Sequence, residues 1–312
     1  AILRKQASES LAIERDRYQQ SVDLATKLQE TLKSVFQRAV FYTAVYKGVS
    51  MVTGAFKDWI SINTELDFAL AKVNTISEVT VTQFAKLQDM SLLSGKGIVD
   101  LAGALYEINS ANIKGADAMR VLEVANRAAV GGFVEAEDAA DTLVDVLNAY
   151  HLATSQTEMV SDKLLKSVEI GKVKWEEMHG VLARVLPVSY ELGISLDELF
   201  GTLSTLTLGG LKFNEAVVGL RQIFMKILKP TDEMKKTLLA LNNEWKTNYD
   251  SMQKVVQSKG IVATLQGLNK VIDEGDAEMA DMFNNVRALT AALNLMGDSG
   301  VKAEEIIGQI AN

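Results

Sequence analysis

The chain has 312 residues, and its two prolines, 6% aromatic residues and 48% hydrophobic residues favour helices over sheets. The absence of cysteine excludes disulfides and thiolate metal sites. The first 47 residues carry eight Lys or Arg against five Asp or Glu, so the net charge of −8 comes from an acidic remainder. Such a remainder argues against sequence-specific nucleic-acid binding. Because the sequence begins at Ala1 without Met, we expect it to be part of a longer chain.

Residues 1–72 are predicted to form one long amphipathic helix. Leu11 begins a series that recurs every seven residues, and a second series on the same side is clearest toward Tyr42. This pattern predicts a weak coiled coil, although an amphipathic helix lying on a partner explains it equally well. The predicted oligomer seam consists of Leu28, Leu32, Val35 and Tyr42.

Within this helix, residues 39–56 form an apolar segment with a single charge, Lys47. Its length is close to the roughly 20 residues that cross a bilayer. A lysine at the middle of a membrane span is costly, so we favour burial against protein in the assembled state. Insertion into a membrane is kept as a later, conditional state.

Residues 73–97 are predicted to be a connector followed by a first capped helix. The β-branched run from Val73 to Thr82 favours extended chain and predicts a short strand there. Thr80, three residues before Gln83, predicts a reciprocal cap for the helix that follows.

Residues 98–242 are predicted to be a core of helical hairpins, with 243–312 as its C-terminal helical extension. One-sided apolar stripes at helical spacing run over 98–108, 133–150, 175–185, 196–206 and 213–227. Between stripes a glycine precedes an apolar residue, which predicts a left-handed helix end onto which that apolar residue folds back. The predicted hinges are Gly97, Gly132, Gly193 and Gly210. Because their spacing is unequal, we expect an irregular bundle rather than a regular solenoid.

Capping residues, prolines and glycines predict where helices start, stop and pack closely. Two Ser-x-x-Glu patterns predict capping boxes, Ser155 with Glu158 and Ser195 with Glu198. Pro187 is predicted to kink a helix, whereas Pro230 followed by Thr231 is predicted to stop one helix and cap the next. Glycines inside helical stretches indicate either close helix packing, which we favour, or a region that comes apart; they are Gly103, Gly180, Gly201 and Gly219.

Catalytic signals are weak. His151 and His179 have no third ligand at a recognisable spacing, so zinc chemistry has little to build on. The carboxylates of Glu135, Glu137 and Asp138 stand at a predicted helix start, where they complement the helix dipole. We therefore predict no enzyme activity, no catalytic, metal-binding or cofactor-binding residues, and no cofactor.

A series of ordered landmarks points to one family. They are LARVLP at 182–187, GISLDEL at 193–199, LTLGG at 206–210 and KPT at 229–231, flanked by alanine-rich helices at 139–150 and 286–293. In this order they resemble the core region of bacteriophage tail tape measure proteins, over about residues 55–295.

The resemblance implies a structural virion protein that sets tail length, acts as a plug or anchor in the tail lumen near the tip, and is released on DNA ejection. It implies contacts with the tail tube, distal tail and baseplate hub proteins, self-association as a homotrimer, and residence in the host cytoplasm during assembly. The apolar segment 39–56 adds a possible partner of its own, the host membrane on ejection. Two alternatives stay open: a membrane-active or pore-forming helical protein, and an intracellular helical adaptor.

Overall fold

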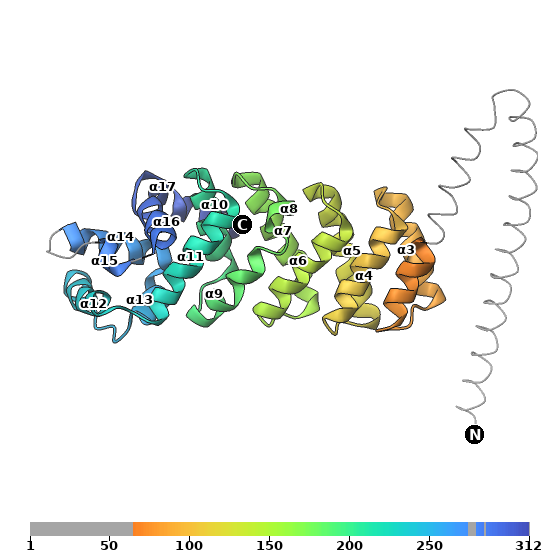
Figure 1. The fold of residues 1–312 in the computed structure, drawn as a ribbon, viewed down its shortest axis with the longest axis horizontal. Coiled ribbons are helices and arrows are strands. Elements are labelled where there is room, and N and C mark those ends of the chain that lie inside the picture. Colours follow the sequence, from red (N-terminus) through yellow and green to blue (C-terminus); the bar gives the residue numbers. More distant parts are fainter. Residues whose placement is uncertain (1–64, 274–278, 284, 312) are drawn as a thin grey trace, which may run out of the picture. The chain divides into compact units, whose positions relative to one another are not determined.

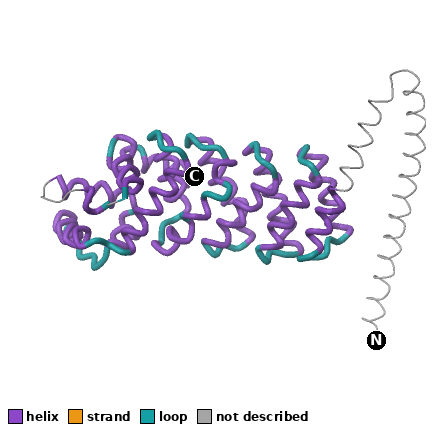
Figure 2. Tube along the Cα trace, viewed as in Figure 1, coloured by secondary structure: helices purple, strands orange, loops and turns teal. Residues whose placement is uncertain are grey.

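A computed structural model describes residues 65–273, 279–283 and 285–311. Within these ranges the chain forms helices joined by turns and loops, without a strand, so the fold is all-α as predicted (Figure 2). The predicted long helix up to residue 64, its coiled-coil seam and the apolar segment 39–56 lie outside the described residues. The chain divides into two compact units, and unit 2 comprises Val73–Glu78 and Leu87–Asn312.

The described helices follow one another with short connections. Their bounds are α3 (Val81–Ser94), α4 (Ile98–Ser110), α5 (Gly115–Gly132), α6 (Ala136–Ala149), η1 (Thr154–Gln156), α7 (Thr157–Ile170), α8 (Trp175–Met178), η2 (Leu182–Arg184), α9 (Leu186–Leu192), α10 (Leu196–Leu208), α11 (Phe213–Leu228), α12 (Asp232–Trp245), α13 (Met252–Lys259), α14 (Ile261–Asp273), α15 (Met279–Met282), α16 (Val286–Met296), α17 (Asp298–Val301) and α18 (Ala303–Ala311).

The short strand predicted after Val73 does not form. Residues 65–74 are helical, a turn follows, and α3 begins at Val81. A β-branched run gains little from extended chain without a second strand beside it. The predicted cap acts instead, because Thr80 Oγ1 accepts from Gln83 N–H (3.2 Å) and Thr80 N–H donates to Gln83 Oε1 (3.0 Å). This reciprocal pair starts the helix inside the run.

In unit 2, the helices pack in an irregular bundle that joins neighbours in sequence as well as helices far apart in sequence (Figure 1). Helix α4 packs on α5 and α6, and α11 packs on α10 and α16. The C-terminal helix α18 returns to pack on α10 and α7. Helix α10 is the most enclosed of them, since ten of its thirteen residues are buried. Its hydroxyls at Thr205 and Thr207 donate to carbonyls one turn earlier, which allows these polar residues to lie inside the bundle.

The apolar stripe from Trp175 to Val185 is buried but is not one helix. It runs through α8 and η2, interrupted by a turn at Gly180, where φ is +64°. The predicted kink at Pro187 is wrong, because this proline lies in the first turn of α9. A residue there needs no N–H for the helix, so proline fits without distortion.

Candidate functional site

The two glycine hinges around α10 behave alike. Gly193 ends α9 with φ +77°, and Ile194 N–H donates to Ser189 O (3.0 Å) while its side chain is buried. Gly210 has φ +98°, and Leu211 N–H donates back to Leu206 O (3.2 Å). At both joints the chain changes direction through the left-handed conformation, which glycine adopts cheaply. They set the directions in which α9, α10 and α11 leave one another.

The other two predicted hinges differ from expectation. Gly97 has φ −62° and precedes α4, while the left-handed residue in that loop is Gly95. Gly132 is the last residue of α5, and Phe133 takes the left-handed conformation instead, with φ +56°. A Cβ at Gly132 would lie 3.2 Å from the Trp175 side chain, so this glycine serves close packing. Phe133 consequently points into solvent and does not fold back onto α5.

Side-chain caps also act at the predicted helix starts after Ser195 and Thr231. Ser195 Oγ accepts from Glu198 N–H (3.2 Å) at the start of α10, so half of the predicted capping box forms. The reciprocal half is wrong, because the Glu198 carboxylate accepts from Ile261 N–H instead. Thr231 Oγ1 accepts from Met234 N–H (3.2 Å), so α12 begins directly after Pro230 and Thr231. Such caps contribute about 1 kcal/mol each.

The capping box predicted at Ser155 and Glu158 is wrong. Ser155 lies within the 3-10 turn η1, and α7 starts at Thr157 without a side-chain cap. Gln156 Oε1 accepts from Ala153 N–H (3.1 Å), so the turn is capped earlier in the chain than the pattern implied. Glu158 instead forms an ion pair with Arg127 (3.0 Å) on α5.

Two carboxylates cap helices other than their own, which the sequence analysis missed. Asp100 on α4 accepts from Ala136 N–H (2.8 Å) and Glu137 N–H (3.0 Å), so it caps α6. Glu198 on α10 accepts from Ile261 N–H at the start of α14. Burial raises the pKa of the Glu198 carboxyl, and the Ile261 N–H bond partly opposes this. Each acid is the third residue of its own helix, and helix starts attract negative charge.

A glycine follows each capping acid by one turn, and at Gly201 it lets a helix come close, since a Cβ there would lie 2.8 Å from Ile307 Cα on α18. A Cβ at Gly103 would meet only the carboxylate end of the Glu137 side chain, which can move aside. A Cβ at Gly219 would likewise lie 2.8 Å from the carbonyl oxygen of Arg287 on α16. Gly180 is different, because it lies in a turn with open space around it, so the predicted close packing is wrong there. The pattern Asp/Glu-Leu-x-Gly, at 100–103 and 198–201, was the available signal.

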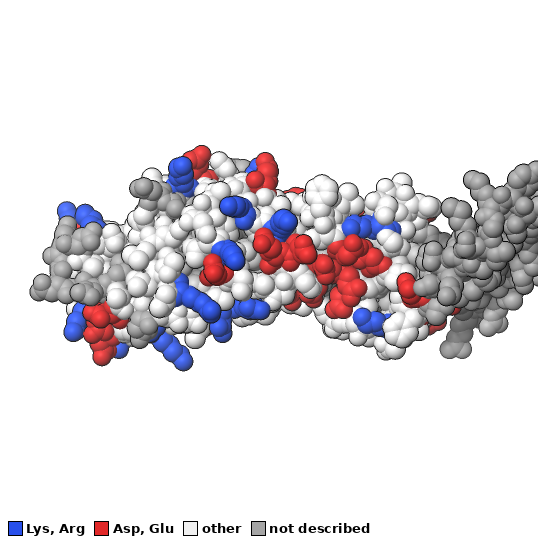
Figure 3. Space-filling view, turned by 45° about the horizontal axis from the view of Figure 1, so that its top comes forward, with Lys and Arg blue, Asp and Glu red and all other residues white. Residues whose placement is uncertain are grey.

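An acidic face extends over α4 and α6. With Glu135, the residue that precedes α6, the two helices carry seven carboxylates and neither Lys nor Arg. Figure 3 shows acidic side chains gathered over this part of unit 2. Hydrogen bonding to Asp100 and the charge of Asp100 raise the pKa of the Glu135 carboxyl.

His179, after α8, contacts this face. Its Nδ1 lies 3.3 Å from Asp141 Oδ2 and its Nε2 lies 3.6 Å from Asp138 Oδ1. One turn further along α6, burial and then the charge of Asp141 raise the pKa of Asp145 to about 6, an effect that His179 opposes. In the described part of the chain, no group of three or more His, Asp or Glu side chains is placed to hold a metal ion. His151 lies elsewhere, with its ring 5.0 Å from that of Tyr190.

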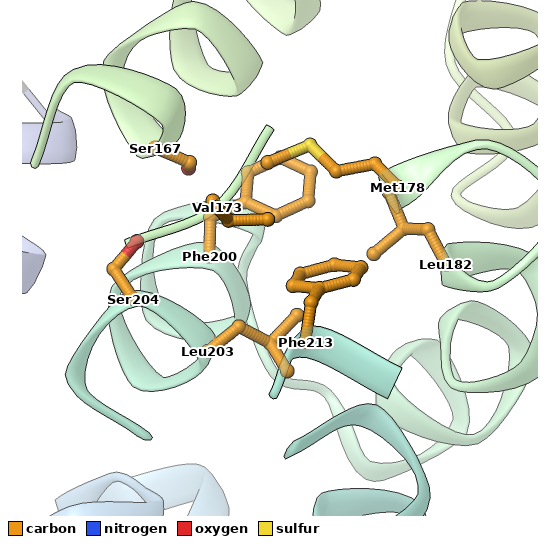
Figure 4. Close-up of a pocket in the computed structure, with 8 residues that line it drawn as sticks. All are labelled: Ser167, Val173, Met178, Leu182, Phe200, Leu203, Ser204 and Phe213. Atoms are coloured by element: carbon orange, nitrogen blue, oxygen red, sulfur yellow. The ribbon is translucent and has the colours of Figure 1, made fainter. Parts of the chain in front are cut away.

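A narrow gap, partly open to solvent, lies between α7, α8, α10 and α11 (Figure 4). Its lining is Ser167, Val173, Met178, Leu182, Phe200, Leu203, Ser204 and Phe213. It is too narrow for a water molecule, so it is a packing gap rather than a ligand pocket. None of the described helices is long and apolar enough to cross a membrane.

Comparison with known proteins places the chain in a family. The model of the family described as phage-related minor tail protein matches residues 85–284. The chain is 22% identical to the tape measure protein of Pneumococcus phage Dp-1 over 81% of its length, and 24% identical to a probable tape measure protein of Clostridium phage phiCD119 over 95%. It spans only 22% and 33% of the length of these two relatives.

No solved structure matches the chain. The resemblance predicted from the sequence landmarks is confirmed by the family match and by both named relatives. Since the match covers well over half of the 312 residues, the chain belongs to the phage-related minor tail protein family.

Proposed function

We propose that this chain is the folded anchoring part of a tape measure protein. In this role the hairpin core stays in the tail lumen near the tip as a plug and binds tail tube, distal tail and baseplate hub proteins. The observation that carries the proposal is the similarity to two tape measure proteins over most of the chain, combined with a core of short helices that reverse direction. A structural rather than an enzymatic role agrees with this similarity.

Helix geometry distinguishes the part of the chain that sets tail length, which we call the ruler, from the part that anchors the protein at the tip. An unbroken helix adds about 1.5 Å of length per residue. Helices that double back, such as α9, α10 and α11 around Gly193 and Gly210, add little length for the same number of residues. Tail length is therefore set by long unbroken helices, of which residues 1–72 are the candidate in this chain, and not by unit 2.

The remaining steps concern assembly and ejection. We propose that the chain associates as a homotrimer along the seam of Leu28, Leu32, Val35 and Tyr42, that it assembles in the host cytoplasm, and that it leaves the tube when DNA is ejected. Residues 39–56 would then enter the host membrane. A synthetic peptide of 39–56 tests the last step, since the absence of both liposome binding and dye leakage would remove it.

Two insertions of equal length test the division between ruler and anchor. Fourteen residues of flexible Gly/Ser sequence are inserted between Lys229 and Pro230, an exposed joint between α11 and α12. In a second phage, two additional heptads are inserted after residue 32. By electron microscopy we expect unchanged tail length in the first phage and tails about 21 Å longer in the second. Equal lengthening by both insertions would exclude the anchor role of unit 2.

A further inference from the structure

Three large apolar side chains lie almost fully in solvent at one edge of unit 2. The exposed fractions are 84% for Leu92, 89% for Leu93 and 95% for Phe133. Leu92 and Leu93 lie in the last turn of α3, and Phe133 directly follows α5. The loop after α3 is joined to the loop after α5, because the Lys96 ammonium donates to Val134 O. We call Leu92, Leu93, Phe133 and the acidic face of α4 and α6 the acidic–apolar edge.

The backbone of Phe133 points to a binding role for this edge. Its φ of +56° and ψ of +41° are left-handed, a conformation that costs an L-residue with a bulky side chain about 1–2 kcal/mol. Asparagine and glycine occupy such positions more readily. A phenylalanine held in a costly conformation with its ring in water gains nothing inside this chain. Exposed apolar groups and local strain of this kind mark contact sites.

A surface of opposite charge lies on the same chain. Helix α11 with its flanking residues carries four cations, at Lys212, Arg221, Lys226 and Lys229, against one carboxylate at Glu215. Leu208, 52% exposed, stands four residues before Lys212. On the face in Figure 3, basic side chains gather on the side of α9 and α11, next to the acidic ones. We call Leu208 and these four cations the α11 surface.

We propose that the acidic–apolar edge of one copy binds the α11 surface of a second copy. Each surface combines an exposed apolar residue with charge of one sign, and the two signs are opposite. Contact between two different surfaces is heterologous and closes into a ring when the rotation permits. The contact rests on the self-association in the proposed function and gives it a second site, separate from the N-terminal seam.

Phe133→Asn is the primary test, because asparagine suits the left-handed backbone and the variant should fold at least as well as the parent. Leu239→Asn, at a residue 67% exposed on α12, is the matched control. We expect sedimentation of the full chain to show association at low salt that weakens at high salt. Phe133→Asn should weaken this association at least about tenfold without lowering the melting temperature, and the control should not weaken it.

Charge reversal supplies a second, reciprocal test. The variant Glu135→Lys with Glu137→Lys reverses part of one surface, and Arg221→Glu with Lys229→Glu reverses part of the other. Each variant alone should associate at least about tenfold more weakly, and an equimolar mixture of the two should associate again.

The outcomes separate this contact from the seam. A parent chain that stays monomeric, or association that persists in Phe133→Asn and in both charge-reversed variants, overturns the proposed contact. If Leu32→Asp with Val35→Asp abolishes association while Phe133→Asn does not, the contact is refuted and the proposed seam stands. Tail length in the insertion experiment is unaffected by either result, so the anchor proposal is judged separately.

Discussion

Replacing Asp145 by asparagine should stabilise the protein at neutral pH. Asp145 lies on α6 beside Asp141, and its pKa is raised from 3.8 to about 6, first by burial. The folded state therefore binds a proton more tightly than the unfolded state. The ionised carboxylate costs stability above pH 6, and this cost disappears as the pH falls below the unfolded pKa.

The size of the effect follows from the shift. About two pKa units correspond to roughly 3 kcal/mol, but Asp145 keeps partial solvent access, which reduces the expected gain to about 1–2 kcal/mol. For a chain of this size such a gain raises the melting temperature by about 2–6 °C. Thermal unfolding followed by circular dichroism at pH 7.5 should show the increase for Asp145→Asn, and at pH 3, below the unfolded pKa, the variant and the parent should melt together.

Asp162→Asn, at an exposed carboxylate on α7, is the matched control and should change the melting temperature at neither pH. A destabilising effect of Asp145→Asn at pH 7.5, or a gain of the same size at both pH values, would refute the argument from burial.

Three further predictions concern stability, measured from urea unfolding curves. Asp100→Ala leaves the two N–H groups at the start of α6 without their acceptor and should cost about 1–2 kcal/mol, most of which Asp100→Asn should restore. Gly219→Ala places a methyl group against α16 and should cost about 1–3 kcal/mol, whereas Gly308→Ala, with open space around it, should stabilise by up to about 1 kcal/mol. Thr231→Ala should cost about 1 kcal/mol and Ser155→Ala nearly nothing, and equal losses would contradict the assignment of caps.

The local signals in the sequence were sufficient where the partners lie within a few residues. The all-α class follows from helical spacing of apolar residues, and the caps at Ser195 and Thr231 depend on groups three positions away. The stripe also predicted the buried face of α11 correctly, because that face is defined within one helix. The stripe residues of α10 are buried too, but α10 is enclosed beyond this one face, with Thr202 and Thr205 buried as well.

Distant partners explain what the sequence could not predict. Asp100 caps a helix that starts 36 residues later, and no local pattern specifies that partner. Gly132 packs closely against the Trp175 side chain, and it is Phe133 that adopts the left-handed backbone conformation at the end of α5. Pro187 could be assigned to a helix start only once the break at Gly180 was known. The seam at Leu28 to Tyr42 and the membrane segment 39–56 stay predictions.

The cross-helix caps have a consequence for how the molecule opens. Fraying of the first turn of α4 would withdraw the Asp100 carboxylate from α6, and fraying of α10 would withdraw Glu198 from α14. Amide protons at the paired helix starts should therefore exchange with deuterium at matching rates, although they are far apart in sequence. A pull on one member of a pair loosens the other, so mechanical extraction would release the bundle in coupled pairs of helices instead of one turn at a time.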